Sequence, residues 1–462
     1  MNRVAEKVYF RSPFFLQNCM VSIYGFHLRR ERYGGRFRDY CHGLRDSQSY
    51  SEDKIAELQS FELQKLLTHA FDNVPFYHEL QQRNGWTARQ FSTAVDLQKL
   101  PIVTKEQFRS NTNDFRSKMS ALRGKAFKLS TSGTSGKPLT VYCDTDSRRH
   151  HYAFWQRLRG WFGIQPGMRR ATFFGRIAVS PEQTRPPFWR YDIFQRNYLF
   201  SSYHMSEANL KHYYEKLVEV QPEEIIGYPS SLFILAKYMK KNNLGGVRPK
   251  AVFTTAETLL EHQRAIIGEA FGRSVVDQYG CTEMALFVSQ CEEGTYHVHP
   301  EHGIVEVVDE SGKPVQNGEE GEAVCTGFVN YAMPVIRYRL GDRLVLDSER
   351  CRCGRNFPVV RQIIGRTDDI LITPDGRPLG RLDPVFKGMS GIYETQIIQT
   401  SRDCLLLKLV ADADFNATNR EELLYEVRKR TGNEMKVELE LVDEIPKDSN
   451  GKFKSVISKV AE

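Results

Sequence analysis

The stretch LSTSGTSGKPL, from Leu129 to Leu139, determines how the rest of the chain can be interpreted. Gly133 and Gly136 let the backbone approach a ligand closely and point its N–H groups at one place, while hydroxyl side chains and Lys137 add donors and positive charge. This composition is typical of a loop that binds polyphosphate. It is not a Walker loop, because the Gly-x-x-x-x-Gly-Lys-Ser/Thr spacing is absent and Pro138 follows the lysine where a helix should start.

A flexible Ser/Gly linker is the alternative interpretation of the same stretch. Linkers rarely carry a Lys-Pro stop followed by an alternating segment such as Leu139-Thr-Val-Tyr142, which exits the stretch like a strand. We therefore expect a polyphosphate-binding loop here.

Length and composition bound the class of protein. At 462 residues the chain exceeds a single hydrophobic core, so we expect two or more domains. The formal net charge of +7 fits anionic small ligands, or a weak attraction to a membrane surface, better than a dedicated nucleic-acid binder, and no nucleic-acid motif is found. The sequence shows neither an apolar run of about 20 residues nor a signal-peptide pattern. Nine cysteines, several beside histidines or in Cys-x-Cys spacing, indicate reduced thiols and a cytoplasmic protein.

Residues 1–45 contain nine basic residues against three acidic ones, interleaved with aromatic and aliphatic side chains between Phe10 and Phe26. Such a segment can lie on an anionic membrane surface as a peripheral contact. It can also place its aromatic side chains against the protein itself. We favour this packing interpretation, because a helical apolar stripe more often faces a core than lipid.

Helical and strand-like periodicities alternate over residues 206–278. Helices are expected at 206–220, 230–241 and 260–271, and strands at 224–227, 251–255 and 274–278. This β-α-β spacing predicts a parallel sheet with right-handed crossovers. Ligands on such sheets bind at the carboxyl ends of the strands.

Polar residues follow two of these strands. The strand at 251–255 is followed by Ala256, Glu257 and Thr258, and the strand at 274–278 by the segment Tyr279-Gly-Cys-Thr-Glu283. The second segment offers a ring to stack on a base, a hydroxyl for a phosphate oxygen and a carboxylate for magnesium. Further along, Asp342 follows a glycine turn and is suited to holding two ribose hydroxyls.

The segment Gly365-Arg-Thr-Asp-Asp369 is a polar break between apolar stretches. After it, alternating strands around 405–409 and 437–441 flank a charged helix at 420–430, which predicts a separate α+β domain. Near the end of the chain, Lys452 follows Gly451 on a polar loop.

With the segments STSGTSGKP, YGxTE, YRxGD and GRxDD in this order, the chain resembles the acyl-adenylate-forming (AMP-binding) superfamily, and most closely phenylacetate-CoA ligase and its CapK-like relatives in capsular polysaccharide gene clusters. The resemblance covers nearly all of residues 50–462. It implies an α/β fold in which a large N-terminal adenylate-forming domain with parallel sheets precedes a small C-terminal α+β domain. We divide the chain into an N-terminal basic and aromatic extension (1–50), an ATP-binding adenylation domain (51–365) and a mobile C-terminal domain with the catalytic lysine (366–462).

The resemblance also implies a role for each site residue. Tyr279 would stack on adenine, Thr282 would touch the α-phosphate and Glu283 would bind Mg²⁺. Asp342 would hold the ribose, Arg366 would contact the nucleotide, and Asp368 would be the hinge. Lys452 would be the catalytic lysine, and Ala256 and Glu257 would join the nucleotide site. The phosphate loop would consist of Thr131, Ser132, Gly133, Thr134, Ser135, Gly136 and Lys137.

The implied function is an ATP- and Mg²⁺-dependent ligase that activates a small carboxylic acid as acyl-AMP and transfers it to coenzyme A. Two alternatives remain open: delivery of the acyl group to a sugar or another non-CoA acceptor in polysaccharide biosynthesis, and a non-catalytic scaffold of an envelope-polysaccharide complex. The segment Thr373-Pro-Asp-Gly-Arg-Pro-Leu-Gly380 keeps the acceptor open, because two prolines stiffen the region that lines the pantetheine tunnel in relatives. The intact Glu283 and Lys452 argue against the scaffold.

Two separated pairs of side chains predict a metal site that adenylation does not require. Cys351 and Cys353 share a tight loop, and Cys291 with His297 lies about sixty residues earlier. A Cys₃His set is one that Zn²⁺ favours in closed structural sites. Buried, metal-free cysteines are the alternative, and His299 and His302 are rivals for the imidazole. A similar Cys and Tyr-His arrangement in the relatives favours His297.

Overall fold

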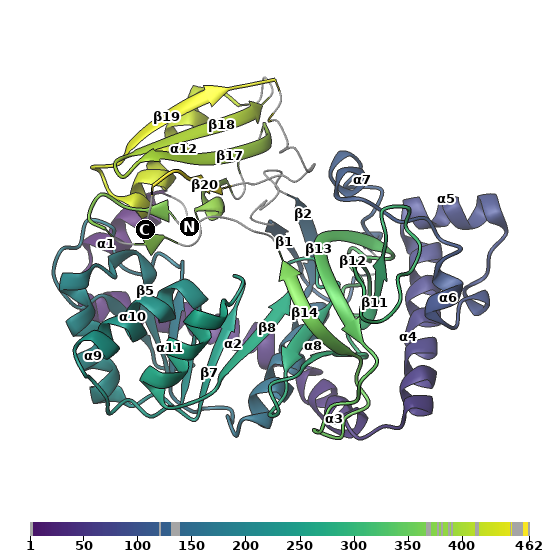
Figure 1. Ribbon diagram of the computed structural model, residues 1–462. Helices are drawn as coiled ribbons and strands as arrows, with labels where there is room; N and C mark the ends of the chain where they lie inside the picture. The colour runs from purple at the N-terminus through teal and green to yellow at the C-terminus, as the bar shows by residue number, and fades with distance from the viewer. Residues whose placement is uncertain are drawn as a thin grey trace.

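The computed structural model describes residues 3–119, 122–130, 139–365, 371–376, 378–379, 382–386, 389, 391–411, 415–443, 445 and 456–460. A large body built around a twelve-stranded sheet lies below a small C-terminal body in Figure 1. The two predicted parts of the fold, a large α/β part and a small α+β part, are therefore both present.

The helices of the described residues include short 3₁₀ turns. They are α1 (Arg3–Arg11), α2 (Phe14–Tyr33), α3 (Phe37–Ser47), α4 (Glu52–Asn73), α5 (Pro75–Asn84), η1 (Ala88–Gln90), α6 (Ala94–Leu97), α7 (Lys105–Ser110), α8 (Thr145–Trp161), η3 (Ser202–His204), α9 (Glu207–Val220), α10 (Pro229–Lys241), α11 (Glu261–Phe271), η4 (Asp383–Phe386) and α12 (Ala417–Thr431).

The strands of the large body begin with a separate hairpin. They are β1 (Ala126–Ser130), β2 (Thr140–Asp144), β3 (Arg170–Phe174), β4 (Trp189–Asp192), β5 (Asn197–Ser201), β6 (Glu224–Gly227), β7 (Ala251–Thr255), β8 (Val275–Gly280), β9 (Phe287–Gln290), β10 (Tyr296–Val298), β11 (Gly303–Val308), β12 (Glu320–Gly327), β13 (Tyr338–Asp347) and β14 (Val359–Gly365). The later strands are β15 (Leu371–Ile372), β16 (Pro378–Leu379), β17 (Ile392–Ser401), β18 (Cys404–Ala411), β19 (Lys436–Leu441) and β20 (Val456–Ser458).

The central sheet has the order β11-β12-β13-β14-β10-β9-β8-β7-β6-β3-β5-β4. Strands β5, β3, β6, β7 and β8 are parallel, as the β-α-β periodicity predicted. The strands on the other side of β8 pair antiparallel, an arrangement that the sequence pattern did not reveal.

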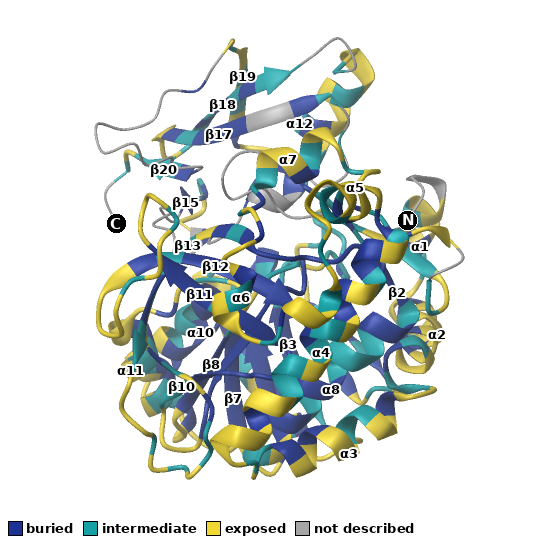
Figure 2. Cartoon of the chain, turned by 90° about the vertical axis from the view of Figure 1, so that its right-hand side faces the viewer, coloured by how far each residue is buried: buried dark blue, intermediate teal, exposed yellow. Residues whose placement is uncertain are grey.

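Helices cover both faces of the parallel half. On one face α9, α10 and α11 bury apolar side chains against β3, β6 and β7 in a shared core. On the other face α2, α3 and α8 lie together. Figure 2 shows the central strands in the buried colour, whereas the outer sides of α3 and α4 are exposed. Helices α8, α9, α10 and α11 therefore present an apolar side to the sheet, as expected for a layered α/β fold.

Helix α2 packs with an unexpected side toward the protein. Its buried residues are mostly small or polar, whereas Phe15 and Ile23 are 63% and 69% exposed. The interpretation that the N-terminal aromatic side chains dock on the protein is therefore wrong for these residues. The reason is the unpaired edge of β4: the Asn18 and Ser22 side chains accept hydrogen bonds from the backbone N–H groups of Tyr191 and Ile193.

The C-terminal body is a four-stranded sheet, β19-β18-β17-β20, covered by α12. Its leucines at 405, 407 and 409 are fully buried and pack against Leu423 and Val427 of α12. The predicted strand-helix-strand order of this region is confirmed. None of the described helices combines the length and the apolarity that crossing a bilayer requires.

Candidate active site

The carboxyl ends of the parallel strands bring three predicted segments together. Gly227 of β6 lies opposite Thr254 of β7, and Thr255 of β7 lies opposite Gln278 of β8. The next residues, Tyr228, Ala256 and Tyr279, are consequently neighbours at one edge of the sheet. This is the edge at which parallel α/β sheets bind ligands.

Tyr279 and Asp342 come from different halves of the sheet, on β8 and β13. The Tyr279 hydroxyl donates a hydrogen bond to Asp342 Oδ2 at 2.7 Å. Burial, followed by the negative charge of Asp342, raises the pKa of Tyr279 well above its usual value, so the phenol stays protonated and donates. Asp342 lies inside a strand, one residue after Gly341 (φ 84°), rather than after the turn that the sequence suggested.

Glu283 is nearly buried, with 4% of its surface exposed. The Tyr338 hydroxyl donates to its Oε1 at 2.9 Å, and Met284 turns the chain sharply after it with a φ of 57°. No described residue donates a hydrogen bond to Oε2. The carboxylate is thus held at one oxygen and can offer the other to a hard cation. Thr282 precedes it and is half-buried.

Ala256 and Glu257 form the turn after β7. Ala256 takes a left-handed conformation with a φ of 72°, which is unusual for a residue with a Cβ atom and common at functional turns. Glu257 Oε2 accepts a hydrogen bond of 3.1 Å from the Ser230 N–H in the first turn of α10, where the helix dipole favours negative charge. The turn therefore fixes α10 beside the site.

Several predicted residues lie outside the described residues: Thr131, Ser132, Gly133, Thr134, Ser135, Gly136, Lys137, Arg366, Asp368 and Lys452. The strands on either side of the predicted phosphate loop are described. Ser130 at the end of β1 pairs with Thr140 at the start of β2, so the stretch between them joins two paired strands. The strand expected after Leu139 is confirmed.

A cleft of about 600 Å³ adjoins Tyr228 and Ala256. Its opposite wall comes from the C-terminal body, through Glu422, Glu426 and Arg430 of α12. These three residues were not among the predicted site residues. The sequence predicted their helix but not its place in a cleft, because charged residues at helical spacing are typical of any solvent-facing helix.

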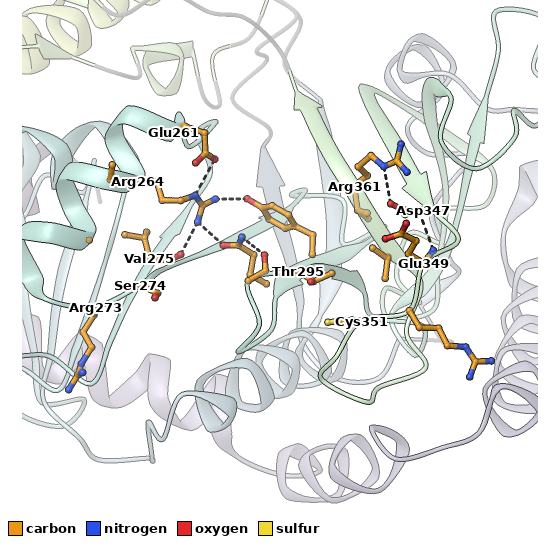
Figure 3. A pocket seen from close by; sticks show the side chains of 18 of the residues that line it. Glu261, Arg264, Arg273, Ser274, Val275, Thr295, Asp347, Glu349, Cys351 and Arg361 are labelled. Atoms are coloured by element: carbon orange, nitrogen blue, oxygen red, sulfur yellow. Dashed lines mark hydrogen bonds and ion pairs between the residues drawn. The ribbon is translucent and has the colours of Figure 1, made fainter.

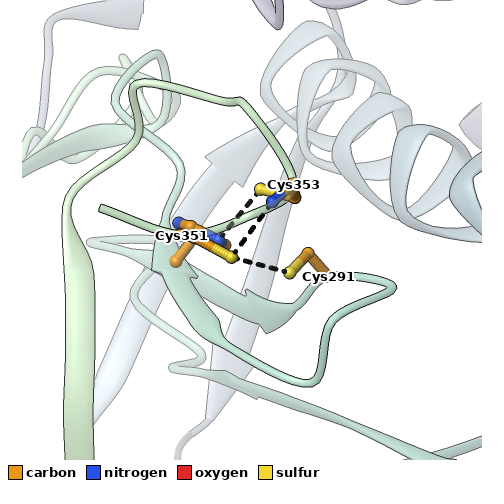
Figure 4. A group of neighbouring side chains, drawn as sticks. Cys291, Cys351 and Cys353 are labelled. Atoms are coloured by element: carbon orange, nitrogen blue, oxygen red, sulfur yellow. Dashed lines mark hydrogen bonds between the residues drawn. The ribbon is translucent and has the colours of Figure 1, made fainter. Parts of the chain in front are cut away.

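The four predicted metal ligands form one cluster. Sulfur and nitrogen atoms of Cys291, His297, Cys351 and Cys353 all lie within 4.8 Å of one another. Cys291 Sγ is 3.6 Å from Cys351 Sγ, and Cys353 Sγ is 3.4 Å from His297 Nε2. Figure 4 shows the three thiols facing one another from two loops. All nine cysteines of the chain are free.

The rival histidines face elsewhere. His299 Nε2 is 2.8 Å from Ser289 Oγ, and its Nδ1 is 2.6 Å from Arg157. His302 Nε2 is 3.3 Å from His151 Nδ1. His297 is therefore the imidazole that the fold brings to the thiols.

A polar groove of about 860 Å³ lies beside this cluster, between α11 and β14 (Figure 3). Arg264 spans one wall and donates to the Val275 carbonyl, Gln290 Oε1 and the Tyr296 hydroxyl. Because Val275 begins β8, this wall reaches the amino end of the strand, away from Tyr279. The groove is thus distinct from the edge that gathers the predicted nucleotide residues.

Comparisons with known proteins agree with this geometry. A solved structure of 2-hydroxyisobutyryl-CoA ligase in complex with 2-HIB-AMP and CoA superposes with a TM-score of 0.58 and 20% identity, covering 89% of this chain and 92% of that one. The chain has the fold of the adenylate-forming ligases.

The relatives found by sequence similarity indicate the class of protein more narrowly than the fold does. Protein CapK of Staphylococcus aureus is 28% identical over 98% of this chain and 99% of its own length. Phenylacetate-coenzyme A ligases of Thermus thermophilus and Escherichia coli are each 27% identical, over 69% and 70% of this chain and 72% and 73% of their own lengths. Residues 371–459 match the CapK C-terminal domain. The chain is a homologue of CapK and of phenylacetate-CoA ligases, and these likenesses support an AMP-forming ligase.

Proposed function

We propose that the protein activates a small carboxylic acid with ATP, forming an acyl-adenylate, and then transfers the acyl group to coenzyme A. The observation that carries the proposal is the convergence of Tyr279 and Glu283, at and just after the end of β8, with Asp342 and Tyr338 of β13. The sequence relatives named as phenylacetate-CoA ligases supply the class of reaction.

The reaction needs positive charge around the α-phosphate, because a carboxylate must approach a triphosphate that is itself negative. Mg²⁺ would supply part of that charge, and Glu283 is the residue that fits it: a nearly buried carboxylate fixed at one oxygen by Tyr338. The hydrogen bond between Tyr279 and Asp342 sets both side chains in place before the nucleotide arrives. Lys452 would neutralise the charge that develops during attack.

The acceptor has two candidates. Coenzyme A follows from the phenylacetate-CoA ligase relatives. A sugar or other non-CoA acceptor, in polysaccharide biosynthesis, is favoured by one observation: β15 and β16 pair as a short ribbon, and Pro374 restricts the turn between them, in the region that matches the CapK C-terminal domain.

Pyrophosphate release tests the function, measured over a panel of carboxylic acids with and without coenzyme A. We expect release with at least one acid and its loss in Lys452→Ala. Release that persists in this variant would refute the assigned lysine. No release with any acid would favour a scaffold instead, whereas acyl-AMP that accumulates in the presence of coenzyme A would favour another acceptor.

We also propose that Cys291, His297, Cys351 and Cys353 hold a structural Zn²⁺. Bonds of about 2.3 Å to a tetrahedral metal place two sulfur atoms roughly 3.7 Å apart, close to the 3.6 Å between Cys291 and Cys351. His297 turns Nε2 toward Cys353, and its Nδ1 lies 3.3 Å from the Phe357 carbonyl, a partner that would fix the ring. Four ligands would close the site, so the metal would stabilise the two loops.

We propose finally that the exposed side of α2 rests on an anionic membrane surface. Phe15, Ile23 and Tyr24 are exposed there, and Phe194 from the turn after β4 packs against Phe26, with the two tilted rings 5.1 Å apart between centroids. Arg29 and Arg30 follow on the same helix. Aromatic side chains at the lipid boundary next to arginines are typical of interfacial helices.

A further inference from the structure

A chamber lies beneath helix α2, on the face of the parallel strands that α2 and α8 cover. Its volume is about 210 Å³, the space of roughly seven water molecules. We call it the arginine chamber, and its defining residues are Arg32, Arg159, Arg170, Arg176, Tyr152 and Thr255. These residues come from several separate parts of the chain, from α2 to the end of β7.

The charges around the chamber do not balance. Among the described residues, the four arginines face Asp192 on the lining and Glu224 behind it. Glu224 accepts hydrogen bonds from both Arg159 and Arg170, at 2.9 and 2.8 Å. Four positive charges against two negative ones leave an excess of two. The chamber therefore favours an anion.

Within the described part of the chain, the Asp192 carboxylate makes no hydrogen bond to any of the four arginines of the chamber. Its Oδ1 accepts hydrogen bonds from the backbone N–H groups of Phe194 and Gln195, and its Oδ2 accepts one from the Gln195 side chain. A Cβ atom on Gly25 would lie 1.8 Å from Asp192 Oδ2, so a larger residue would push α2 away. The Asp192 carboxylate therefore stabilises the turn after β4, at the place where Gly25 of α2 approaches it closely.

Arg32 has no hydrogen-bond acceptor among the described residues. It is 9% exposed, and its Nε makes no hydrogen bond. Its guanidinium lies over the Tyr152 ring instead, with the guanidinium carbon 4.6 Å from the ring centroid. A buried guanidinium without an acceptor is unfavourable unless something else completes its hydrogen bonds. A ligand oxyanion would do so, with charge-assisted bonds.

The chamber connects to the candidate active site. Phe174, Arg176 and Thr255 line both the chamber and the cleft that contains Tyr228 and Ala256. Arg170 and Phe174 are the first and last residues of β3, about 13 Å apart along an extended strand. A molecule with its reacting carboxylate at the edge of the sheet could therefore reach the arginines with its other end.

We propose that the arginine chamber binds the far end of the acid substrate and that this end carries a second carboxylate or comparable oxyanion. The proposal rests on the adenylation function, since it assigns the reacting carboxylate to the cleft beside Ala256. Tyr152 and Trp155 also line the chamber, where they would contact a ring or a short apolar body.

A matched pair of acids tests the chamber directly. 4-Carboxyphenylacetate and 4-methylphenylacetate differ in the second carboxylate alone, and calorimetry without ATP measures the binding of each. We expect the dianionic acid to bind at least tenfold more tightly to the wild type. Arg32→Met should remove this preference and Arg32→Lys should retain part of it, whereas Arg30→Met, an exposed arginine on the same helix, should preserve it.

Equal binding of the two acids, or a preference unchanged in Arg32→Met, would overturn the proposal. Thermal unfolding establishes that the variant is folded, and Arg32→Gln provides the same comparison if Met destabilises α2. Pyrophosphate release distinguishes a failure of the chamber proposal from a failure of the adenylation proposal. Arg32-dependent binding, with no pyrophosphate release from any acid of the panel, would leave the chamber intact and refute adenylation. Release with equal efficiency for both acids, in wild type and variant, would refute the chamber alone.

Discussion

The Tyr279 hydroxyl donates a hydrogen bond to the Asp342 carboxylate at 2.7 Å and so joins the last parallel strand to the antiparallel half of the sheet. The bond brings a residue expected to stack on adenine into contact with one expected to hold the ribose. A base on the Tyr279 ring would thereby have its sugar next to Asp342. The antiparallel half would thus supply a wall of the proposed nucleotide site.

Asp342→Asn should weaken ATP binding more than Tyr279→Phe does. The asparagine loses the charged acceptor for two ribose hydroxyls, whereas the phenylalanine keeps the ring and loses a single hydrogen bond. Charged hydrogen bonds are worth about 1.5–3 kcal/mol, so we expect the KM for ATP to rise roughly tenfold to a hundredfold in Asp342→Asn. Pyrophosphate exchange at varied ATP measures both variants. An unchanged KM in Asp342→Asn would exclude the ribose role.

Glu283→Gln should lower kcat and raise the Mg²⁺ concentration needed for half-maximal rate. The amide keeps the shape of the side chain and can still accept a hydrogen bond from Tyr338, but it loses the charge that holds a divalent cation. A Mg²⁺ titration of pyrophosphate release measures the shift. Tyr338→Phe is the matched control for the hydrogen bond alone and should change the titration less. Identical titrations for wild type and Glu283→Gln would remove Glu283 from the metal site.

The protein should bind vesicles that contain anionic lipid and release them at high salt, since arginines and exposed aromatic side chains act together. Sedimentation with phosphatidylglycerol vesicles, compared with phosphatidylcholine alone, measures this. The double variant Phe15→Ser with Ile23→Ser should lose binding without loss of fold, because both side chains are exposed. Salt-insensitive sedimentation, or none, would leave the exposed side of α2 without a membrane role.

Stability should fall on acidification from pH 6.5 toward pH 4, in part through His151. Burial lowers the pKa of this imidazole to about 4 in the folded protein, against about 6.5 in an unfolded chain. Above pH 6.5 both states are neutral. Below pH 6.5 the unfolded chain binds a proton that the folded protein does not bind. The free energy of unfolding therefore falls by on the order of 3 kcal/mol once the pH reaches 4.

Urea unfolding at pH 7 and pH 5 measures this loss. His151→Gln should reduce the difference between the two pH values, and His27→Gln, at an exposed position, should not. An equal pH dependence in wild type and His151→Gln would exclude the histidine as the source.

Local patterns predicted the parallel half of the fold well. The strand at 251–255 and the helix at 230–241 follow from side-chain periodicity within one segment, and they match β7 and, within one residue, α10. The antiparallel half was not predicted, because strand pairing such as β13 with β14 depends on contacts between distant segments. The orientation of α2 was misjudged, since an edge strand's need for hydrogen bonds outweighed the burial of aromatic side chains.

The candidate sites also differ in how well the sequence predicted them. Three cysteines and a histidine were predicted to meet because few residue types bind zinc, so their chemistry limited the choices. The arginine chamber had no such signal: Arg32 belongs to an N-terminal arginine cluster whose members are mostly exposed, and its neighbours Tyr152 and Arg170 come from other elements.

Purified protein should contain about one zinc per chain, and removing it should lower the unfolding temperature. Elemental analysis measures the metal, and a chelator titration followed by thermal unfolding measures its contribution. Cys351→Ser should lose both zinc and stability, because three remaining ligands hold the metal more weakly. Pyrophosphate release at low temperature should change little, since a closed four-ligand site offers no position to substrate.

Two controls distinguish a bound zinc from a disulfide and from unrelated thiol effects. Cys404→Ser changes a free cysteine outside the cluster and should keep both the zinc and the stability. A disulfide between Cys291 and Cys351, whose sulfur atoms lie 3.6 Å apart, would instead make stability sensitive to a reductant and insensitive to a chelator. Metal-free protein that unfolds at the same temperature as the untreated protein would exclude a structural zinc, and the four side chains would then be ordinary metal-free groups.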